Sequence, residues 1–265
     1  MFFKNFAFKK RLKKLFRNNK TLMLAYDQGL EHGPKDFNLR NVNPEFVFEI
    51  AEKARFNALV VQPGVAEKYA KSYNVPIIVK VNGKTSLTGE VVSRQNCSVK
   101  RALKLNPVGI GFTIYPGSYY EGLMFSEFSK VVEEAHNFGL PVIVWSYPRN
   151  SSHSIDEKST DIVAYAARIA LELGADVVKL KYNGDFEGFK WVVRNAGKVR
   201  VVVAGGAKKS LHELFGMTED VVKAGACGLT IGRNVWQHDE PLKVSYALKK
   251  IIFDGFSAED VLKKF

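Results

Sequence analysis

The sequence is poor in cysteine, with only Cys97 and Cys227 in 265 residues. They form no Cys-x-x-Cys pair and no metal-ligand spacing, which argues against a disulfide framework or a structural zinc site. We expect both thiols to be reduced, buried and inert, as is usual in the cytoplasm. No apolar run is long enough to cross a bilayer, so no membrane span is expected.

Eight short β-branched runs recur along the chain, each following a turn residue and preceding a helical pattern. Most are almost continuously apolar, as expected for parallel strands that are buried on both sides. The runs are 21–27, 58–64, 76–82, 108–115, 141–147, 176–182, 200–205 and 228–233. Eight alternating strand and helix units predict a (β/α)8 barrel, also called a TIM barrel.

A single α/β domain over residues 1–265 is the domain organisation we expect, because about 250 residues is typical of such a barrel. A doubly wound open sheet is the competing architecture. It would need fewer strands, and neither nucleotide fingerprint, GxGxxG or GxxxxGK(S/T), follows the first predicted strand.

Positive charge is concentrated at the amino terminus. Residues 1–20 hold eight of the 39 basic residues and none of the 27 acidic ones, so the rest of the chain carries only +4 of the net +12. Phe8, Leu12, Leu15 and Phe16 recur there at helical spacing and predict a basic amphipathic helix. Such a helix is a candidate for binding membranes or RNA. We favour a helix that caps the barrel floor or packs in an oligomer, and expect no nucleic-acid or membrane partner.

Strand parity indicates which side chains point into the barrel, because successive residues alternate between its two faces. In 176–182 the apolar residues Val178 and Leu180 face the helices, so Lys179 and Lys181 point inward. The same argument turns Asp27 and Lys80 inward. In 141–147, a further pair, Trp145 and Tyr147, shares a face that we interpret as the lumen.

Lys179 is the strongest catalytic candidate because it lies within a strand rather than at its end. Burial and a neighbouring cation lower the pKa of a lysine, and Lys181 or Lys80 is a candidate for that cation. A partly neutral amine is the nucleophile that forms an imine with a carbonyl substrate. The protonated imine then accepts electrons from the carbon–carbon bond that breaks.

Imine chemistry also needs a proton carrier, and the phenol of Tyr147 is a candidate. Trp145 is interpreted as a wall of the site, although simple lumen packing would explain both aromatic residues. Asp27 either orients a substrate hydroxyl or pairs with a lysine. His32 follows the first strand in a turn and has either a binding or a structural role.

The last two predicted strands end in glycines next to cations: Gly205 and Gly206 with Lys208, and Gly232 with Arg233. Barrel enzymes commonly hold a phosphate here with backbone N–H groups, and glycine permits the close approach. Tight turns are the alternative interpretation.

Four segments together resemble the archaeal-type class I fructose-bisphosphate aldolases, and the similarity spans nearly the whole chain. They are 24–34 (LAYDQGLEHGP), 144–149 (VWSYPR), 178–182 (VKLKY) and 232–237 (GRNVWQ). The resemblance implies Lys179 as the Schiff-base lysine, Tyr147 as general acid/base, Asp27 and Trp145 as catalytic neighbours, and the glycine ends as a phosphate cradle. It also implies no metal, no other cofactor and a homo-oligomer, commonly a decamer. Many members have histidine where this chain has Gln28, so a proton-transfer role at that position is not carried over.

The leading functional hypothesis is therefore reversible cleavage of fructose 1,6-bisphosphate in glycolysis or gluconeogenesis. A related Schiff-base aldolase or transaldolase acting on another sugar phosphate, such as an aminodideoxy-heptulosonate synthase, is the first alternative. A non-catalytic scaffold that binds acidic partners through residues 1–20 is the second. Deleting that segment would abolish the scaffold's function, whereas Lys179→Ala would not.

Overall fold

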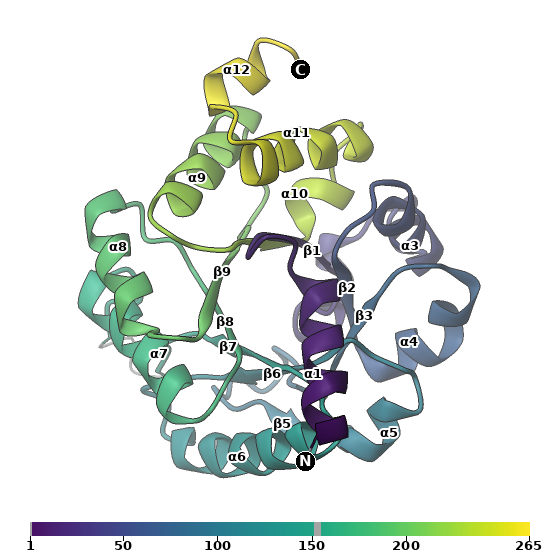
Figure 1. Ribbon diagram of the computed structural model, residues 1–265, viewed down its shortest axis with the longest axis vertical. Helices are drawn as coiled ribbons and strands as arrows, with labels where there is room; N and C mark the ends of the chain where they lie inside the picture. Colours follow the sequence, from purple (N-terminus) through teal and green to yellow (C-terminus); the bar gives the residue numbers. More distant parts are fainter. Residues whose placement is uncertain (1, 151–154) are drawn as a thin grey trace.

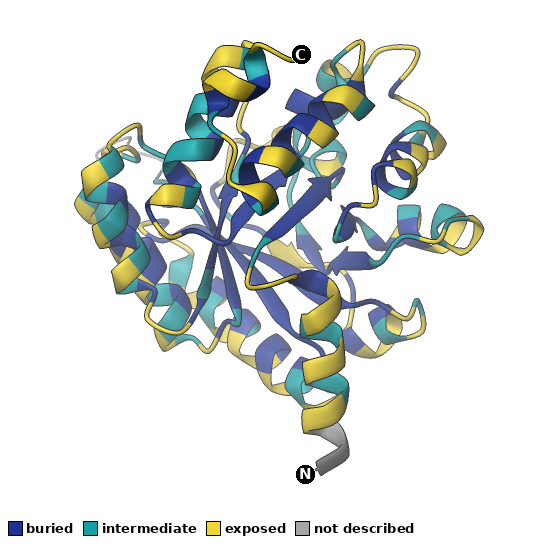
Figure 2. Ribbon diagram, turned by 45° about the horizontal axis from the view of Figure 1, so that its top comes forward, coloured by how far each residue is buried: buried dark blue, intermediate teal, exposed yellow. Residues whose placement is uncertain are grey.

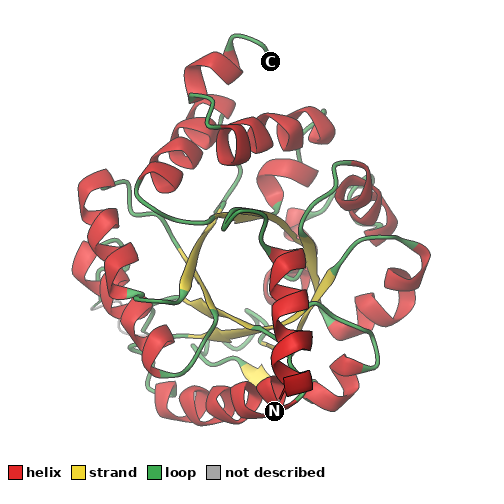
Figure 3. Cartoon of the chain, in the orientation of Figure 1, coloured by secondary structure: helices red, strands yellow, loops and turns green. Residues whose placement is uncertain are grey.

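The computed structural model describes residues 2–150 and 155–265, and its centre is a closed barrel of parallel strands. The order around the barrel is β1-β10-β9-β8-β7-β6-β3-β2. The strands are β1 Thr21–Ala25, β2 Ala58–Val61, β3 Ile77–Lys80, β6 Gly109–Ile114, β7 Val142–Ser146, β8 Val177–Leu180, β9 Arg200–Ala204 and β10 Gly228–Ile231. Each lies within one of the eight predicted runs, so the barrel prediction is confirmed (Figure 3).

Helices surround the barrel as an outer layer (Figure 1). They are α2 Gly29–His32, α3 Pro44–Lys53, α4 Pro63–Tyr69, α5 Val99–Leu103, α6 Glu121–Asn137, α7 Thr160–Glu172, α8 Phe186–Asn195, α9 Leu211–Lys223, α10 Arg233–Trp236, α11 Pro241–Asp254 and α12 Ala258–Leu262. Short 3-10 helices occupy Gly33–Asp36 and Ala70–Ser72. The sequence pattern did not reveal a small antiparallel hairpin after β3, formed by β4 Asn82–Gly83 and β5 Arg94–Gln95.

Two separate apolar clusters divide the strand residues by parity. Leu22, Leu24, Val178 and Leu180 belong to the larger cluster between the strands and the helices. Met23, Val60, Ile78, Ile143, Val177 and Val202 belong to the smaller cluster inside the barrel. The barrel strands are buried except at the two ends of β9, Arg200 and Ala204, which are partly exposed (Figure 2). The alternation is the one predicted from the sequence, and it follows from the two-residue period of a strand.

The amino-terminal helix, α1 Phe2–Leu15, crosses the end of the barrel at which the strands begin (Figures 1 and 3). Leu15 and Phe16 are buried and join the cluster inside the barrel, with Leu12 packed against it. Phe8 lies edge-on to the His136 ring of α6, with 5.8 Å between ring centroids. Arg11 donates hydrogen bonds to the carbonyls that follow α6. Leu12, Leu15 and Phe16 therefore face the barrel floor, whereas Phe8 packs on α6.

Candidate active site

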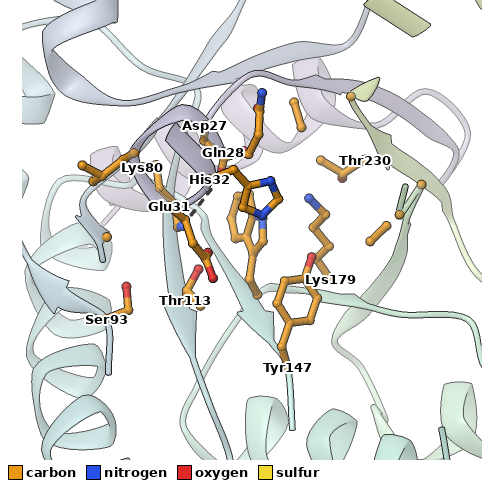
Figure 4. A pocket seen from close by; sticks show the side chains of 18 of the residues that line it. Asp27, Gln28, Glu31, His32, Lys80, Ser93, Thr113, Tyr147, Lys179 and Thr230 are labelled. Carbon is orange, nitrogen blue, oxygen red and sulfur yellow. Dashed lines mark ion pairs between the residues drawn. The ribbon is translucent and has the colours of Figure 1, made fainter. Parts of the chain in front are cut away.

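A cavity of about 370 Å³ lies at the carboxyl ends of the strands, at the opposite end of the barrel from α1. Most of the predicted site residues line it: Asp27, Trp145, Tyr147, Lys179, Gly205, Gly206, Gly232 and Arg233. Ten lining residues are labelled in Figure 4, and they come from strands and loops that are distant in sequence. The fold thus gathers these predicted residues at one site.

Lys179 lies on β8 and its side chain points into the cavity (Figure 4), where the residue is only 6% exposed. Burial lowers the pKa of its amine to about 8, because a charged ammonium loses its hydration there. This pKa includes the effects of the nearby charges: Asp27 raises it, whereas Lys80 and Arg233 lower it. The cations that act on Lys179 are thus Lys80, one of the two lysines proposed from the sequence, and Arg233.

Asp27 lies two residues beyond β1, and its carboxylate faces Lys80 at the end of β3. The Lys80 Nζ atom is 3.5 Å from Asp27 Oδ2, and both side chains are almost completely buried (dashed line in Figure 4). Burial lowers the pKa of Lys80, while the Asp27 carboxylate opposes that change. Two roles were predicted for Asp27, orienting a substrate hydroxyl or pairing with a lysine. The structure shows the pairing with Lys80.

Trp145 on β7 forms an inner wall of the cavity and is 3% exposed. Its ring centroid lies 4.9 Å from Lys80 Nζ and 5.0 Å from Lys179 Nζ. The electron-rich face of an indole attracts cations at such distances. The indole therefore contacts both buried amines as well as filling the lumen.

Tyr147 follows β7 directly, and its hydroxyl points into the cavity near the Lys179 side chain (Figure 4). Burial raises the pKa of this phenol well above its usual value of 10, and the negative charge of Asp27 adds to the effect. Lys181 Nζ lies 5.7 Å from the Tyr147 ring centroid and 2.7 Å from a carboxylate oxygen of Glu157. Lys181 thus lies at the rim, paired with an acid.

The glycines that follow β9 and β10 are close to neighbouring backbone and side chains. A Cβ atom at Gly232 would lie 2.6 Å from the carbonyl oxygen of Ala25, and one at Gly205 would lie 2.5 Å from Ile231. Gly206 has a φ of +72°, which favours glycine. Asn234 holds this segment by donating to the carbonyl of Gly205. A side chain is therefore hindered by neighbouring atoms at Gly205 and Gly232 and by the backbone conformation at Gly206.

Arg233 lies at the start of α10 and lines the cavity. Its guanidinium is 3.3 Å from Asp36, which also binds the ring of His32. Burial opposes the ionisation of Asp36, but these two partners hold its pKa below the usual value. His32 thus lines the cavity and also binds Asp36, so the binding and the structural interpretation of this residue both remain.

Lys208 is not in the cavity lining that the structure describes, and its amine donates to the carbonyl of Gln237 at 3.2 Å.

Further polar residues line the cavity on the side of β3 and β7, and sequence parity did not single them out. Glu31 accepts hydrogen bonds from the Tyr115 hydroxyl and from Arg149. Arg149 and Lys84 lie 5.0 and 5.9 Å from the Tyr115 ring centroid. All but Tyr115 line the cavity; Glu31 belongs to the short helix α2, and the others lie in loops or directly after a strand. The only signal for them was proximity to a strand end, which many surface residues share.

Gln28 lines the cavity beside Asp27, and its Nε2 atom is buried without a hydrogen-bond partner in the described structure.

No three His, Cys, Asp or Glu side chains within residues 2–150 and 155–265 come together as a metal site. Over the same residues, no helix is long and apolar enough to span a membrane.

Residues 21–238 match the model of a protein family described as "DeoC/LacD family aldolase". The class 1 fructose-bisphosphate aldolase of Thermoproteus tenax is 48% identical over 243 residues, which cover 90% of this chain and 92% of that protein. A more distant relative is 2-amino-3,7-dideoxy-D-threo-hept-6-ulosonate synthase 1 of Archaeoglobus fulgidus. It is 29% identical and covers 96% of this chain and 94% of its own length.

Among solved structures, an archaeal fructose-1,6-bisphosphate aldolase superposes with a TM-score of 0.87 and 45% sequence identity. The match covers 92% of this chain and 99% of that one. In that structure the catalytic lysine is covalently bound to the carbinolamine intermediate of the substrate.

Proposed function

The chain belongs to the DeoC/LacD family of aldolases, and from this we infer that it is a class I fructose-bisphosphate aldolase. It reversibly cleaves fructose 1,6-bisphosphate into dihydroxyacetone phosphate and glyceraldehyde 3-phosphate through a Schiff base. The observation that carries this inference is the Lys179 amine, buried in the cavity with a pKa of about 8. At that pKa a useful fraction of the amine is neutral at physiological pH.

The first half of the reaction forms the imine on Lys179. The neutral amine attacks the C2 carbonyl carbon of the substrate, and its proton moves to the carbonyl oxygen to give a carbinolamine. The Tyr147 phenol then donates its proton to the departing hydroxyl, which leaves as water. The products of this step are an iminium cation and a Tyr147 phenolate, which stabilise each other electrostatically. Such pairing makes the high pKa of the Tyr147 phenol compatible with proton transfer.

The second half breaks the bond between C3 and C4. The Tyr147 phenolate accepts the C4 hydroxyl proton while the C3–C4 electron pair moves towards the iminium nitrogen, giving an aldehyde and a neutral enamine. Tyr147 next returns the proton to C3, and water hydrolyses the resulting iminium to release the ketone. Hydrolysis re-forms the neutral Lys179 amine and releases one proton, which the Tyr147 phenolate accepts, so both groups return to their starting protonation states.

We assign one phosphate of the substrate to the backbone of Gly205, Gly206 and Gly232 together with Arg233. Support comes from their proximity at the ends of β9 and β10 and from the absence of Cβ atoms there. The second phosphate is assigned to the other side of the cavity, where Lys84 and the loop after β7 supply positive charge. Lys208 is removed from this assignment because its amine binds a carbonyl away from the cavity lining.

The assignment of activity is tested by assaying purified protein with fructose 1,6-bisphosphate and measuring both triose phosphates. We expect cleavage that persists in excess EDTA, because the imine rather than a metal ion accepts the electrons. Activity with a different sugar phosphate but not with this one would support the related-aldolase alternative, to which the Archaeoglobus relative points. Absence of cleavage with every sugar phosphate in a donor and acceptor panel would contradict both.

The pH dependence of the reaction should follow the Lys179 amine. Because only the neutral amine attacks the carbonyl, kcat/KM should rise with pH and level off above about 8, the pKa of the buried amine. The measurement is kcat/KM for cleavage across the neutral and alkaline range. A midpoint near the ordinary lysine value of about 10.4 would contradict the role of burial.

Arg233→Gln should weaken substrate binding. A charge-assisted hydrogen bond contributes about 1.5–3 kcal/mol, so KM is expected to rise about 10- to 100-fold with a smaller change in kcat. Steady-state kinetics with fructose 1,6-bisphosphate measure both parameters. Lys208→Gln is the matched control, because its amine lies outside the lining and should change KM much less. Equal effects of the two variants would contradict the phosphate assignment.

We further propose that the protein works in the cytoplasm, in glycolysis or gluconeogenesis, as a homo-oligomer. Both cysteines are free and buried, as suits a reducing compartment. Tyr165 of α7 and Trp191 of α8 are more than half exposed, and large exposed hydrophobic side chains are typical of subunit contacts. Light scattering of the purified protein would give the subunit number.

A further inference from the structure

A second buried amine in the cavity has no part in the reaction sequence derived above. Lys80 is 5% exposed, as deeply buried as Lys179, and it lies on β3. A buried lysine is costly unless it is paired, and the partner of Lys80 is the Asp27 carboxylate at 3.5 Å. Within residues 2–150 and 155–265, Lys80 thus has a carboxylate at ion-pair distance and Lys179 has none.

Both amines lie over the ring of Trp145, next to the glycine at position 111. Lys80 pairs in register with Gly111 of β6, and Trp145 pairs with Lys179 of β8. A Cβ atom at Gly111 would lie 2.8 Å from the Trp145 ring and 3.1 Å from Lys80 Cδ. The bare backbone at Gly111 lets the indole lie next to the Lys80 side chain. Each Nζ atom then lies about 5 Å from the ring centroid, Lys80 at 4.9 Å and Lys179 at 5.0 Å.

The charges around the two amines are few. Those acting on Lys179 come from Asp27 beyond β1, Lys80 on β3 and Arg233 after β10. Lys80 itself experiences the carboxylates of Asp27 and Glu31. Lys181 is paired with Glu157 at the rim and is not among these charges. Of the three charged groups that act on Lys179, only the Asp27 carboxylate attracts its ammonium.

We propose that Lys80 is a positioning residue that stays charged and binds the Asp27 carboxylate beside the indole that Lys179 also contacts, so that Lys179 is the amine that becomes neutral. The inference rests on the proposed function, in which Lys179 is the nucleophile. Two lysines in one cavity thereby acquire different roles. The amine with a carboxylate at ion-pair distance holds its proton, and the amine without one loses it.

Lys80→Met tests this proposal. Without Lys80, the buried Asp27 carboxylate has Lys179 as its remaining lysine neighbour, and the pKa of Lys179 should rise by about one unit or more. The pKa is measured as the pH midpoint of trace acetylation of Lys179 by acetic anhydride, followed by mass spectrometry of the Lys179 peptide. This readout requires no sugar substrate, so it remains informative if the proposed aldolase activity is wrong. Borohydride trapping with dihydroxyacetone phosphate tests that activity separately.

Lys181→Met is the matched control, because it removes an amine two residues from Lys179 that pairs with Glu157. It should leave the acetylation midpoint of Lys179 unchanged. Lys80→Arg keeps the charge and should return the midpoint towards the wild-type value. An unchanged or lower midpoint in a folded Lys80→Met protein would overturn the proposal, as would an equal shift in the control.

If Lys80→Met does not fold, Asp27→Asn tests the proposal by removing the carboxylate instead of the cation. It removes the attraction that raises the pKa of Lys179 and leaves the repulsion from Lys80 and Arg233. The acetylation midpoint of Lys179 should then fall by about one unit. A midpoint that stays or rises in Asp27→Asn would contradict the proposal.

Discussion

Replacing Lys179 with methionine is expected to lower kcat/KM for fructose 1,6-bisphosphate by at least about 10⁴-fold, the scale on which loss of a covalent nucleophile acts. Borohydride with dihydroxyacetone phosphate should leave a reduced adduct on wild-type protein, located at Lys179 by peptide mass, and none on the variant. The variant should also be no less stable than wild type. Methionine has a similar length and brings no charge into the cavity.

The stability expectation follows from the pKa of Lys179. This pKa is about 8 in the folded protein and 10.5 ordinarily, so the unfolded chain binds more protons between those values. Below pH 8 the buried lysine therefore disfavours folding, and its removal should raise the melting temperature.

Lys181→Met is the control for chemistry as well, because its amine pairs with Glu157 at the rim. It should retain the borohydride adduct at Lys179. An adduct at Lys181 or Lys80 in wild-type protein would show that the nucleophile is assigned wrongly.

Tyr147→Phe should lower kcat by about 10²- to 10⁴-fold, the range attributed to a positioned general acid or base. Loss of the phenol removes the proton carrier for carbinolamine dehydration and for C3–C4 cleavage, but leaves the attacking amine in place. A slow borohydride adduct at Lys179 should therefore persist while cleavage is lost. Stopped-flow measurement of cleavage and prolonged trapping separate the two steps.

Tyr182→Phe is the matched control for loss of a phenol. Its hydroxyl bonds to Asp220 at 3.2 Å and its ring packs against Phe189 in the cluster outside the barrel. It should leave kcat within a few fold of wild type. If Tyr147→Phe cleaved the substrate as fast as this control, another group would have to carry the proton.

The inward orientation of Lys179 and Trp145 could be predicted from the sequence because strand periodicity is strictly local. Val178 and Leu180 had to face the helices, and that requirement fixed the direction of the residue between them. The same reasoning predicted that Lys80 points inward. It gave no partner for Lys80, because Asp27 follows a different strand and the distance between them depends on closure of the barrel.

Loop residues could not be predicted in the same way. Arg149, in the loop after β7, meets Glu31 of α2 in the cavity although they lie 118 positions apart, and no periodicity connects them. Lys208 follows the glycine pair as a phosphate ligand would, yet the loop turns its amine to Gln237. A loop has no repeating geometry, so the direction of its side chains follows from contacts that form only on folding.

The sequence by itself determined the eight strands and the face of each, and therefore that Lys80 and Lys179 point into the barrel. Those features depend on hydrophobic pattern and strand period alone. Lys181, also predicted to point inward, lies beyond the end of β8 at the rim. Only the tertiary structure decided that Lys80 pairs with Asp27, that Lys181 pairs with Glu157 and that Arg233 acts on Lys179. Electrostatic interactions depend on distance and burial in space, and the barrel brings charges together from residues that are far apart in the chain.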